Sequence, residues 1–561
     1  KRYDDSDVYK IIEGASYSMT TVPDPGLDAY VDSIIGLIAI GQEADGYLTT
    51  WKTINPQDPP AEWCPPGGRW EHLYSTHELY NAGHLYEAAA AHYHATGKKN
   101  LLNIAIKNAD LVVDVFNNEL PFKVPGHQII ETGLIKLYLI THKEEYLKLA
   151  RHFLEMRGDF THRNSYGARS QDHKPVVEQD EAVGHAVRAT YMYAGMTDIA
   201  ALYDDEAYRN AVDDLWENIV SKKIYLTGGI GARHEGEAFG ENYELPNLTA
   251  YNETCAAIAN VYWNYRMFLL HGDSKYIDVL ERSLYNGVIS GVALDGKNFF
   301  YPNPLECDMH FKFNNGGSLI REPWFDASCC PTNLCRFMPS VPGYIYALTE
   351  DKIYVNLFVQ SSSGFEMNEN KVAVSQQTNY PWDGNVKVSV SPEKATEMSV
   401  CLRIPGWAVN QPVPGDLYQY EKSGNELVAI LVNGEPVEYK TEKGYAIITR
   451  NWEQGDIIDY KLPMAIQRVK ANPKVKDDLG KVALERGPIV YCVEGNDNAN
   501  IDELAVNAKT VFENFYDANL FGGVEVITAS GANKNDFIAI PYYTWNNRGA
   551  NKMKVWLPEE N

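Results

Sequence analysis

Three cysteines and one glutamate, placed in two short segments, are the residues of this chain best suited to chemistry. Cys255 follows Glu253 by two positions, and Cys329 and Cys330 form an adjacent pair before Pro331. Three thiolates and one carboxylate suit tetrahedral Zn²⁺, which binds sulfur at about 2.3 Å and carboxylate oxygen at about 2.0–2.2 Å. If the fold brings the two segments together, the sequence predicts a zinc site.

Pro331 indicates how the paired thiols become ionised. Proline suits the first position of a helix, so Cys329 and Cys330 are expected at a helix N-terminus, where the helix dipole lowers the pKa of a thiol. The residue types alone leave two alternatives open. Adjacent cysteines are often buried as small apolar side chains, and each can instead form a disulfide with a distant cysteine.

Histidines and cysteines are concentrated in the first part of the chain. All fourteen histidines lie at or before His310, and five of the eight cysteines lie between Cys255 and Cys335. Chemistry is therefore expected in the first part of the chain, with the second part as support.

Segments with helical periodicity follow one another closely up to about residue 347. Short turns such as ATGKKN and HGDSKY join many of them. The predicted helices are Asp7–Met19, Leu27–Gln42, His77–Thr96, Lys99–Phe116, Gln128–Thr141, Lys143–Met156, Glu181–Ala200, Asp205–Val220, Thr254–Leu270, Ser274–Val288 and Asn333–Ala347. Eleven helices are one short of six antiparallel pairs. We therefore expect an (α/α)6 barrel, with one further helix upstream of Lys1.

After about residue 348 the hydrophobic period changes to two, which is typical of strands. Segments such as VKVSVS, MSVCLRI and YAIITR are separated by Gly, Pro and Asn turns. More than ~200 residues is generous for one β-sandwich, so two are predicted. The predicted fold is multi-domain α + β. It has a barrel over 1–348, a first β-sandwich over 349–466 that 550–561 help to complete, and a second over 467–549.

Composition limits the partners of the chain. Its 561 residues carry a formal net charge of -25, which argues against nucleic acid, because polyanion binding requires a basic surface. No apolar run approaches the ~18 residues of a membrane helix. Lys1 opens the sequence without a signal peptide, so a removed leader and a periplasmic location, or a cytoplasmic one in a bacterium, both stay open. The sequence is compatible with a homodimer.

Ordered motifs run through the whole chain. The longest are the segment Gly228–Ala256, which contains HEGEAF, and WFDASCCPTNLCR at Trp324–Arg336. Others are DSDVYK, DGYL, THELYNAGH, GHQIIE, DEAVGHAVR, LRIPGWA, ERGPIVYC and PYYTWNNR. Together they resemble glycoside hydrolase family 127, the β-L-arabinofuranosidases. That family has an (α/α)6 barrel followed by β-sandwich domains, and an N-terminal stretch before DSDVYK that has no counterpart here.

The resemblance implies a retaining exo-glycosidase that releases terminal L-arabinofuranose from plant cell-wall or pectic oligosaccharides. It makes Cys329 the nucleophile and Glu237, in HEGEAF, the general acid/base. The implied Zn²⁺ ligands are Glu253, Cys255, Cys329 and Cys330. By its sequence context alone, Glu237 could equally be a carboxylate on a surface loop.

Three histidines are expected to contact the sugar. His77, His127 and His185 each lie at or near the start of a predicted helix, so they can point into one mouth of a barrel. Neutral imidazoles donate and accept hydrogen bonds without adding a charge. The resemblance assigns these histidines to the sugar, and it aligns Tyr301 and Glu281 with site positions as well.

Other function classes stay open. A sugar epimerase or lyase on the same barrel would use paired histidines for acid/base work and would need no thiolate. In a binding or structural protein, zinc would only tie Cys255 to the Cys329 segment. Within the same mechanism, another pectin sugar such as aceric acid is an alternative to arabinofuranose.

Overall fold

The computed structural model describes residues 2–58, 64–424, 426–530 and 536–560, which form two compact units. The first unit comprises Lys1–Ile219, Arg233–Phe239 and Trp324–Val341. The second comprises Val220–Ala232, Gly240–Pro323 and Pro342–Asn561. Within the described ranges, no helix combines the length and apolarity needed to cross a membrane.

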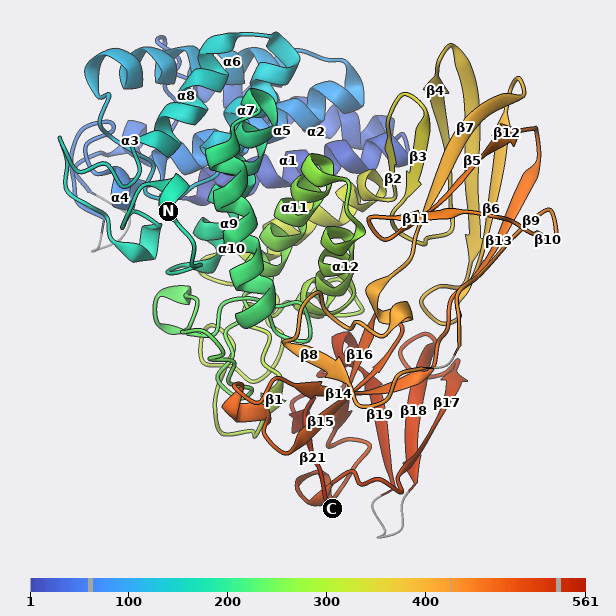
Figure 1. Ribbon diagram of the computed structural model, residues 1–561. Helices are drawn as coiled ribbons and strands as arrows, with labels where there is room; N and C mark the ends of the chain where they lie inside the picture. The colour runs from blue at the N-terminus through green and yellow to red at the C-terminus, as the bar shows by residue number, and fades with distance from the viewer. Residues whose placement is uncertain (1, 59–63, 425, 531–535, 561) are drawn as a thin grey trace. The chain divides into compact units, whose positions relative to one another are not determined.

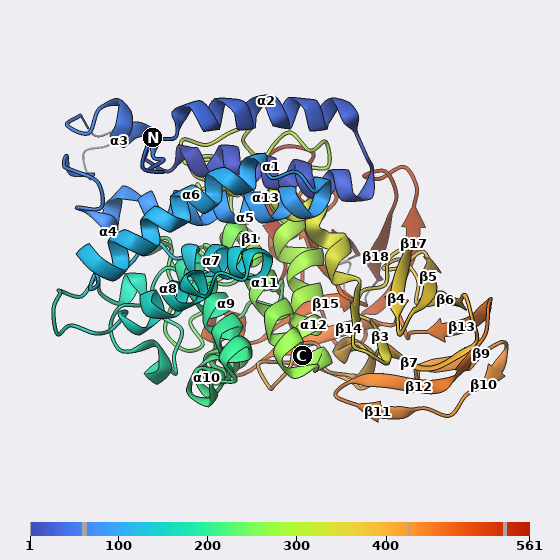
Figure 2. The same cartoon turned by 90° about the horizontal axis from the view of Figure 1, so that it is seen from above.

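Helices make up most of the first unit. They are α1 (Asp4–Thr21), α2 (Pro25–Gly41), α3 (Thr50–Ile54), α4 (Leu73–Thr76), α5 (Glu78–Thr96), α6 (Asn100–Asp114), α7 (Ile130–Thr141), α8 (Glu144–Glu155), α9 (Ala186–Tyr203), α10 (Glu206–Lys222) and α13 (Cys329–Phe337). Helix α5 is buried along most of its length and packs against α1, α6 and α7 (Figure 1). Helix α2 lies beside α1 (Figure 2).

The second unit opens with helices α11 (Thr254–His271) and α12 (Ser274–Arg282) and continues in strands. One five-stranded sheet has the order β11-β12-β7-β3-β2, and one six-stranded sheet has the order β10-β9-β13-β6-β5-β4. Their strands are β2 (Tyr346–Leu348), β3 (Lys352–Val355), β4 (Ser361–Met367), β5 (Asn370–Thr378), β6 (Asn385–Pro392), β7 (Thr396–Arg403), β9 (Ala429–Val432), β10 (Glu435–Pro436), β11 (Lys440–Glu442), β12 (Tyr445–Trp452) and β13 (Asp456–Lys461). Residues of both sheets, such as Val400 and Val388, share one apolar core.

A ten-stranded sheet completes the second unit. Its strands are β1 (Glu306–Cys307), β8 (Tyr418–Tyr420), β14 (Ile466–Ala471), β15 (Lys481–Arg486), β16 (Ile489–Glu494), β17 (Val511–Asp517), β18 (Val524–Ser530), β19 (Phe537–Pro541), β20 (Met553–Lys554) and β21 (Leu557–Pro558). The prediction that 550–561 help to complete the first β-sandwich is wrong, because β20 pairs with β16 and β21 pairs with β15 in this sheet.

The predicted order of a helix-rich part followed by β-rich parts is confirmed, and each of the eleven predicted helices overlaps an observed one. Closure of the helices into an (α/α)6 barrel and the sandwich form of the sheets stay predictions. The last predicted helix, Asn333–Ala347, is wrong at both ends. Helix α13 starts at Cys329, after the N-cap residue Ser328, and ends at Phe337.

Helix α13 is tied to α1 at its first turn and at its last. Near its start, the Asp7 carboxylate accepts hydrogen bonds from Ser328 Oγ at 2.5 Å and from Thr332 Oγ1 at 2.9 Å. Near its end, the buried Arg336 guanidinium lies 3.1 Å from a carboxylate oxygen of the buried Glu13. Both contacts join segments more than 300 residues apart in the sequence, and they fix where Cys329 lies in the first unit.

Replacing Arg336 by Met is expected to lower the free energy of unfolding by about 3–5 kcal/mol, because it leaves the Glu13 carboxylate buried without its partner. Chemical denaturation followed by circular dichroism measures the loss. Arg209→Met is the matched control, since its partner Asp204 is 90% exposed and exposed pairs contribute about 0–1 kcal/mol. Equal losses in the two variants would contradict a tie through Arg336.

Candidate functional site

Glu237 lies in a tight loop that the backbone holds against the start of α9. The φ angle of Glu237 is +54° and that of the preceding Gly236 is +72°. Residues other than glycine rarely adopt this left-handed backbone conformation. The next residues pair with the backbone before α9, where Phe239 N donates to Gly184 O at 2.9 Å. As a result, Glu237 Oε2 lies 2.6 Å from His185 Nε2.

The contact between His185 and Glu237 holds a proton. Burial lowers the pKa of His185, and the neighbouring Glu237 raises it again by a smaller amount. The buried His185 Nδ1 has no hydrogen-bond partner among the described residues. A neutral imidazole with Glu237 at 2.6 Å therefore shares one proton between Nε2 and the carboxyl group, and that proton can reside on either residue.

The three predicted sugar-binding histidines come together. The ring centroids of His77 and His127 are 5.8 Å apart, and those of His127 and His185 are 5.6 Å apart. Nδ1 of His77 lies 3.2 Å from Ser75 O, and Nδ1 of His127 lies 2.8 Å from its neighbour's carbonyl oxygen. Since a carbonyl oxygen only accepts, Nδ1 carries the proton in each ring and Nε2 is left as an acceptor. Burial lowers the pKa of His77 and His127 well below the usual range, so both rings are neutral.

The four predicted metal ligands form one group. The donor atoms of Glu253, Cys255, Cys329 and Cys330 all lie within 4.8 Å of one another. Glu253 is the N-cap residue of α11, and Cys329 and Cys330 are the first two residues of α13, so both helix N-termini favour negative charge on these groups. All eight cysteines lie in the described ranges, and none of them is in a disulfide. Pro331 occupies the third rather than the first helical position, where its missing N–H still costs no intrahelical hydrogen bond.

A second group of donor atoms contains Glu253 together with His185 and Glu237. One donor atom each of His185, Glu237 and Glu253 lies within 4.8 Å of the other two. A third group, Asp28, Asp32 and His92, holds a cation of the protein itself, because Lys98 Nζ donates to the two carboxylates at 2.7 and 2.6 Å. Among the groups that the described residues form, the cluster of cysteines is therefore the one suited to a metal ion.

Glu281 does not join these residues as a sugar ligand. It is almost completely buried, and one of its carboxylate oxygens accepts hydrogen bonds from Arg403 at 2.6 Å and from Tyr380 at 2.7 Å. We therefore assign Glu281 to the ionic core that supports the sheets. Tyr301 lies beside the first residue of α11, because its carbonyl oxygen accepts a hydrogen bond from Thr254 N at 2.9 Å.

Sequence reasoning missed two residues that belong to the surroundings of the site. Asp7, which holds the start of α13, lies in the DSDVYK motif, but its contacts are with residues far along the chain. Arg169 Nη2 lies 3.7 Å from Glu237 Oε2 and comes from a loop without a sequence signal.

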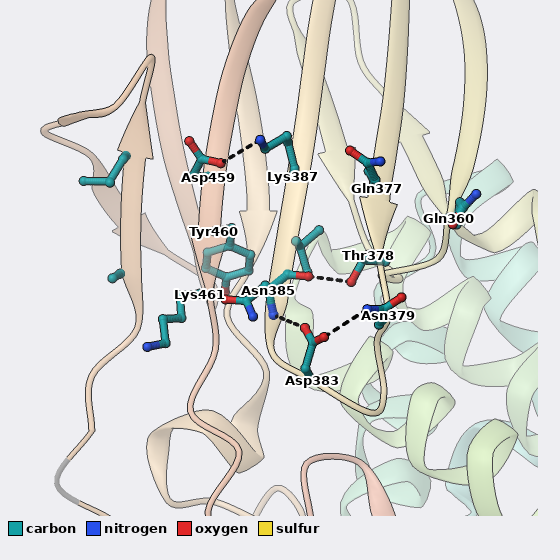
Figure 3. A pocket seen from close by; sticks show the side chains of 13 residues that line it. Gln360, Gln377, Thr378, Asn379, Asp383, Asn385, Lys387, Asp459, Tyr460 and Lys461 are labelled. Carbon is teal, nitrogen blue, oxygen red and sulfur yellow. Dashed lines mark hydrogen bonds and ion pairs between the residues drawn. The ribbon is translucent and has the colours of Figure 1, made fainter. Parts of the chain in front are cut away.

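A separate groove of about 660 Å³ lies in the second unit, on the six-stranded sheet (Figure 3). Side chains of β5, β6 and β13, such as Gln377, Lys387 and Asp459, line it. Lys387 and Asp459 pair with each other across neighbouring strands at 3.7 Å. None of the predicted site residues lines this groove.

Comparison with known families accounts for nearly the whole chain. The model described as "Beta-L-arabinofuranosidase, GH127 catalytic domain" matches residues 1–343. The chain belongs to glycoside hydrolase family 127. The middle-domain and C-terminal-domain models of that family match residues 352–464 and 466–558. As a member of this family, the protein is a glycoside hydrolase.

Relatives of this GH127 protein are named as arabinofuranosidases. A non-reducing end β-L-arabinofuranosidase of Bifidobacterium longum is 33% identical, and the match covers 99% of this chain and 89% of the relative. The structure of a GH127 β-arabinofuranosidase is 48% identical with a TM-score of 0.93, and the match covers 100% of this chain and 88% of that one. A GH127 β-L-arabinofuranosidase from Geobacillus stearothermophilus T6 is 41% identical with a TM-score of 0.91, and the match covers 100% and 91%.

The donor group predicts about one metal ion per chain in the purified GH127 protein. Cys255→Ser removes one of three sulfur donors and is expected to lower the metal content at least tenfold after dialysis against a chelator. Elemental analysis by plasma mass spectrometry measures the content. Cys335→Ser is the control, because Cys335 lies on the same helix as Cys329 but outside the group. Unchanged metal content in Cys255→Ser would contradict the assignment.

Proposed function

We propose that this glycoside hydrolase is a retaining exo-β-L-arabinofuranosidase that acts on plant-derived glycans with a zinc-bound Cys329 thiolate as nucleophile. The observation that carries the proposal is that Cys329 belongs to the donor group that also contains Glu253, and that Glu253 in turn groups with Glu237 and His185. A nucleophile and an acid/base are then available around one sugar. The arabinofuranose specificity rests on the names of the relatives.

The donor group fits Zn²⁺. Ligands at about 2.3 Å on a tetrahedron lie roughly 3.8 Å from one another, which agrees with donor atoms that all lie within 4.8 Å. Three sulfurs and one carboxylate oxygen are soft enough to favour zinc over magnesium or calcium. When bound, zinc keeps the coordinating thiols deprotonated at neutral pH and holds them in place.

Burial selects Cys329 among the three sulfurs. Cys330 and Cys255 are buried, whereas Cys329 is partly exposed, so Cys329 is the thiolate that a sugar can approach. In the first step its sulfur forms a bond to the anomeric carbon, and the bond from that carbon to the leaving oxygen breaks. Glu237 donates its proton to the leaving oxygen.

The second step restores both residues. The Glu237 carboxylate accepts a proton from water, and the water oxygen displaces the Cys329 sulfur from the anomeric carbon. His185 supports this exchange, because Glu237 and His185 share one proton over 2.6 Å. His77 and His127 offer neutral Nε2 acceptors to sugar hydroxyls, which suits a terminal sugar without charge.

The first product released is expected to keep the anomeric configuration of the substrate, because two displacements at one carbon each invert it. Proton NMR within the first minutes of hydrolysis, before mutarotation, measures the configuration. An inverted first product would rule out a covalent intermediate on Cys329.

Glu237→Gln is expected to slow glycosides with poor leaving groups by roughly 10²–10⁴-fold, because the amide cannot donate the required proton. An aryl glycoside with an activated leaving group needs little protonation and is expected to lose much less in the first step. Stopped-flow measurement of phenol release separates the two steps.

Glu235→Gln is the matched control, since Glu235 is exposed in the same loop and is expected to leave both substrates unchanged. Cys329→Ser is expected to abolish activity on both substrates. An enzyme that kept its activity as Cys329→Ser would use chemistry that needs no thiolate, and equal losses on both substrates in Glu237→Gln would exclude that residue as the acid.

A further inference from the structure

The residues around Glu237 differ in how far they are buried. His127 and His185 are 9% and 6% exposed, whereas the side chains of Glu237 and Arg169 are 30% and 42% exposed. In the proposed mechanism, Glu237 protonates the oxygen that links the sugar to its leaving group. The cleaved sugar then belongs with the buried histidines, and the leaving group belongs at the exposed edge, next to Arg169.

The backbone of Arg169 is hydrogen-bonded, whereas its side chain is partly exposed. Its carbonyl oxygen accepts a hydrogen bond from His185 N at 3.1 Å, and a Cβ atom on Gly236 would lie 3.8 Å from its Nε. Its nearest ionic neighbour, Glu237 Oε2, is 3.7 Å away, beyond hydrogen-bond range. The five N–H donors of the Arg169 guanidinium form no hydrogen bond to any other described residue.

Positive charge gathers here although the chain as a whole is acidic, with a formal net charge of -25. Burial, and next the charge of Arg169, lower the pKa of Arg188 to about 9. Arg169 also contributes to lowering the pKa of the buried Arg2, to about 10. The positive charge of Arg169 thus opposes the charges of Arg188 and Arg2, and an anion bound beside Arg169 would relieve that repulsion.

Tyr74 adds an apolar surface to the same edge. It is 41% exposed, and its ring packs at 5.2 Å against the ring of Tyr166. Tyr166 lies three positions before Arg169, and the Tyr74 backbone lies against Gly126, whose carbonyl oxygen accepts a hydrogen bond from Arg188 Nη1 at 3.0 Å. An exposed aromatic ring beside an arginine offers a stacking surface and a charged hydrogen-bond donor to one ligand.

We propose that Arg169 and Tyr74 bind the leaving group, and that Arg169 selects a leaving group that carries a carboxylate, namely a uronic acid. A guanidinium binds a carboxylate through two parallel hydrogen bonds, which a neutral ester cannot match. This inference rests on the proposed function, since it uses Glu237 to locate the leaving group.

The test compares two synthetic substrates, a β-L-arabinofuranoside of a uronic acid methyl glycoside and the methyl ester of the same compound. The ratio of their kcat/KM values is expected to be roughly 10–100 in the unaltered protein, as a hydrogen-bonded ion pair contributes. Arg169→Gln is expected to bring the ratio to about 1. Arg169→Lys is expected to give an intermediate ratio, because an ammonium group cannot bind a carboxylate through two parallel bonds.

Three further measurements test the comparison. Because Arg169 is partly exposed, raising the salt concentration from about 0.05 to about 0.5 M is expected to lower the ratio in the unaltered protein. Arg209→Gln, an exposed arginine paired with Asp204, is expected to keep the full ratio. Tyr74→Ala is expected to raise KM for both substrates and to leave their ratio unchanged.

A ratio near 1 in the unaltered protein, or an unchanged ratio in Arg169→Gln, would overturn the inference and leave Arg169 as a residue that only orients Glu237. Release of arabinose from neither substrate would instead overturn the proposed function. In that case, calorimetric titration with the uronic acid methyl glycoside and its ester decides the inference without turnover. Binding without preference for the acid would overturn it.

Discussion

Mutual repulsion among acidic groups is the constraint on which the site depends. Three thiols and one carboxyl group have donor atoms within 4.8 Å of one another. Two negative charges 4 Å apart cost about 1 kcal/mol in water and about 4 kcal/mol near a protein surface, so the four groups ionise together only around a cation. The N-termini of α11 and α13 contribute partial positive charge in the same place. In the proposed mechanism, the ionised form of Cys329 thus depends on both a bound cation and the two helix N-termini.

In the proposed mechanism, the nucleophile Cys329 and the acid/base Glu237 are supported in different ways. Cys329 opens a helix that the partly buried contact of Asp7 and the buried contact of Arg336 hold at its two ends, which limits the directions in which its sulfur can point. Glu237 lies in a loop with a left-handed backbone, and its main link is the short contact to His185. A rigid nucleophile defines where the anomeric carbon is attacked, while a carboxyl group on a loop can follow the leaving oxygen as it moves away.

Local sequence signals predicted the helices and the strand-rich second part and marked three cysteines and one glutamate as a candidate donor set, because periodicity and residue type are properties of short segments. These signals failed where contacts with residues distant in the sequence determine the local structure. The last helix was predicted to start at Asn333, whereas α13 starts at Cys329, directly after Ser328, whose hydroxyl donates to Asp7, 321 positions earlier. Glu281 aligned with a site position, but Arg403, 122 positions away, engages it inside the core. Arg169 has no local signal, and only folding places it next to Glu237.

In the proposed binding mode, the charges around the sugar follow an order that gives the substrate a direction. The thiols belong to the group around Cys329, the neutral imidazoles belong to the half-buried His77 and the buried His127, and the side chain of Arg169 is 42% exposed. A neutral terminal sugar is desolvated at low cost among neutral rings, whereas a charged group is not. An anionic leaving group bound in the opposite orientation would place its carboxylate among buried histidines and beside thiolates, where repulsion and desolvation both oppose it. The same charges that position the reactive groups thereby exclude the reversed orientation.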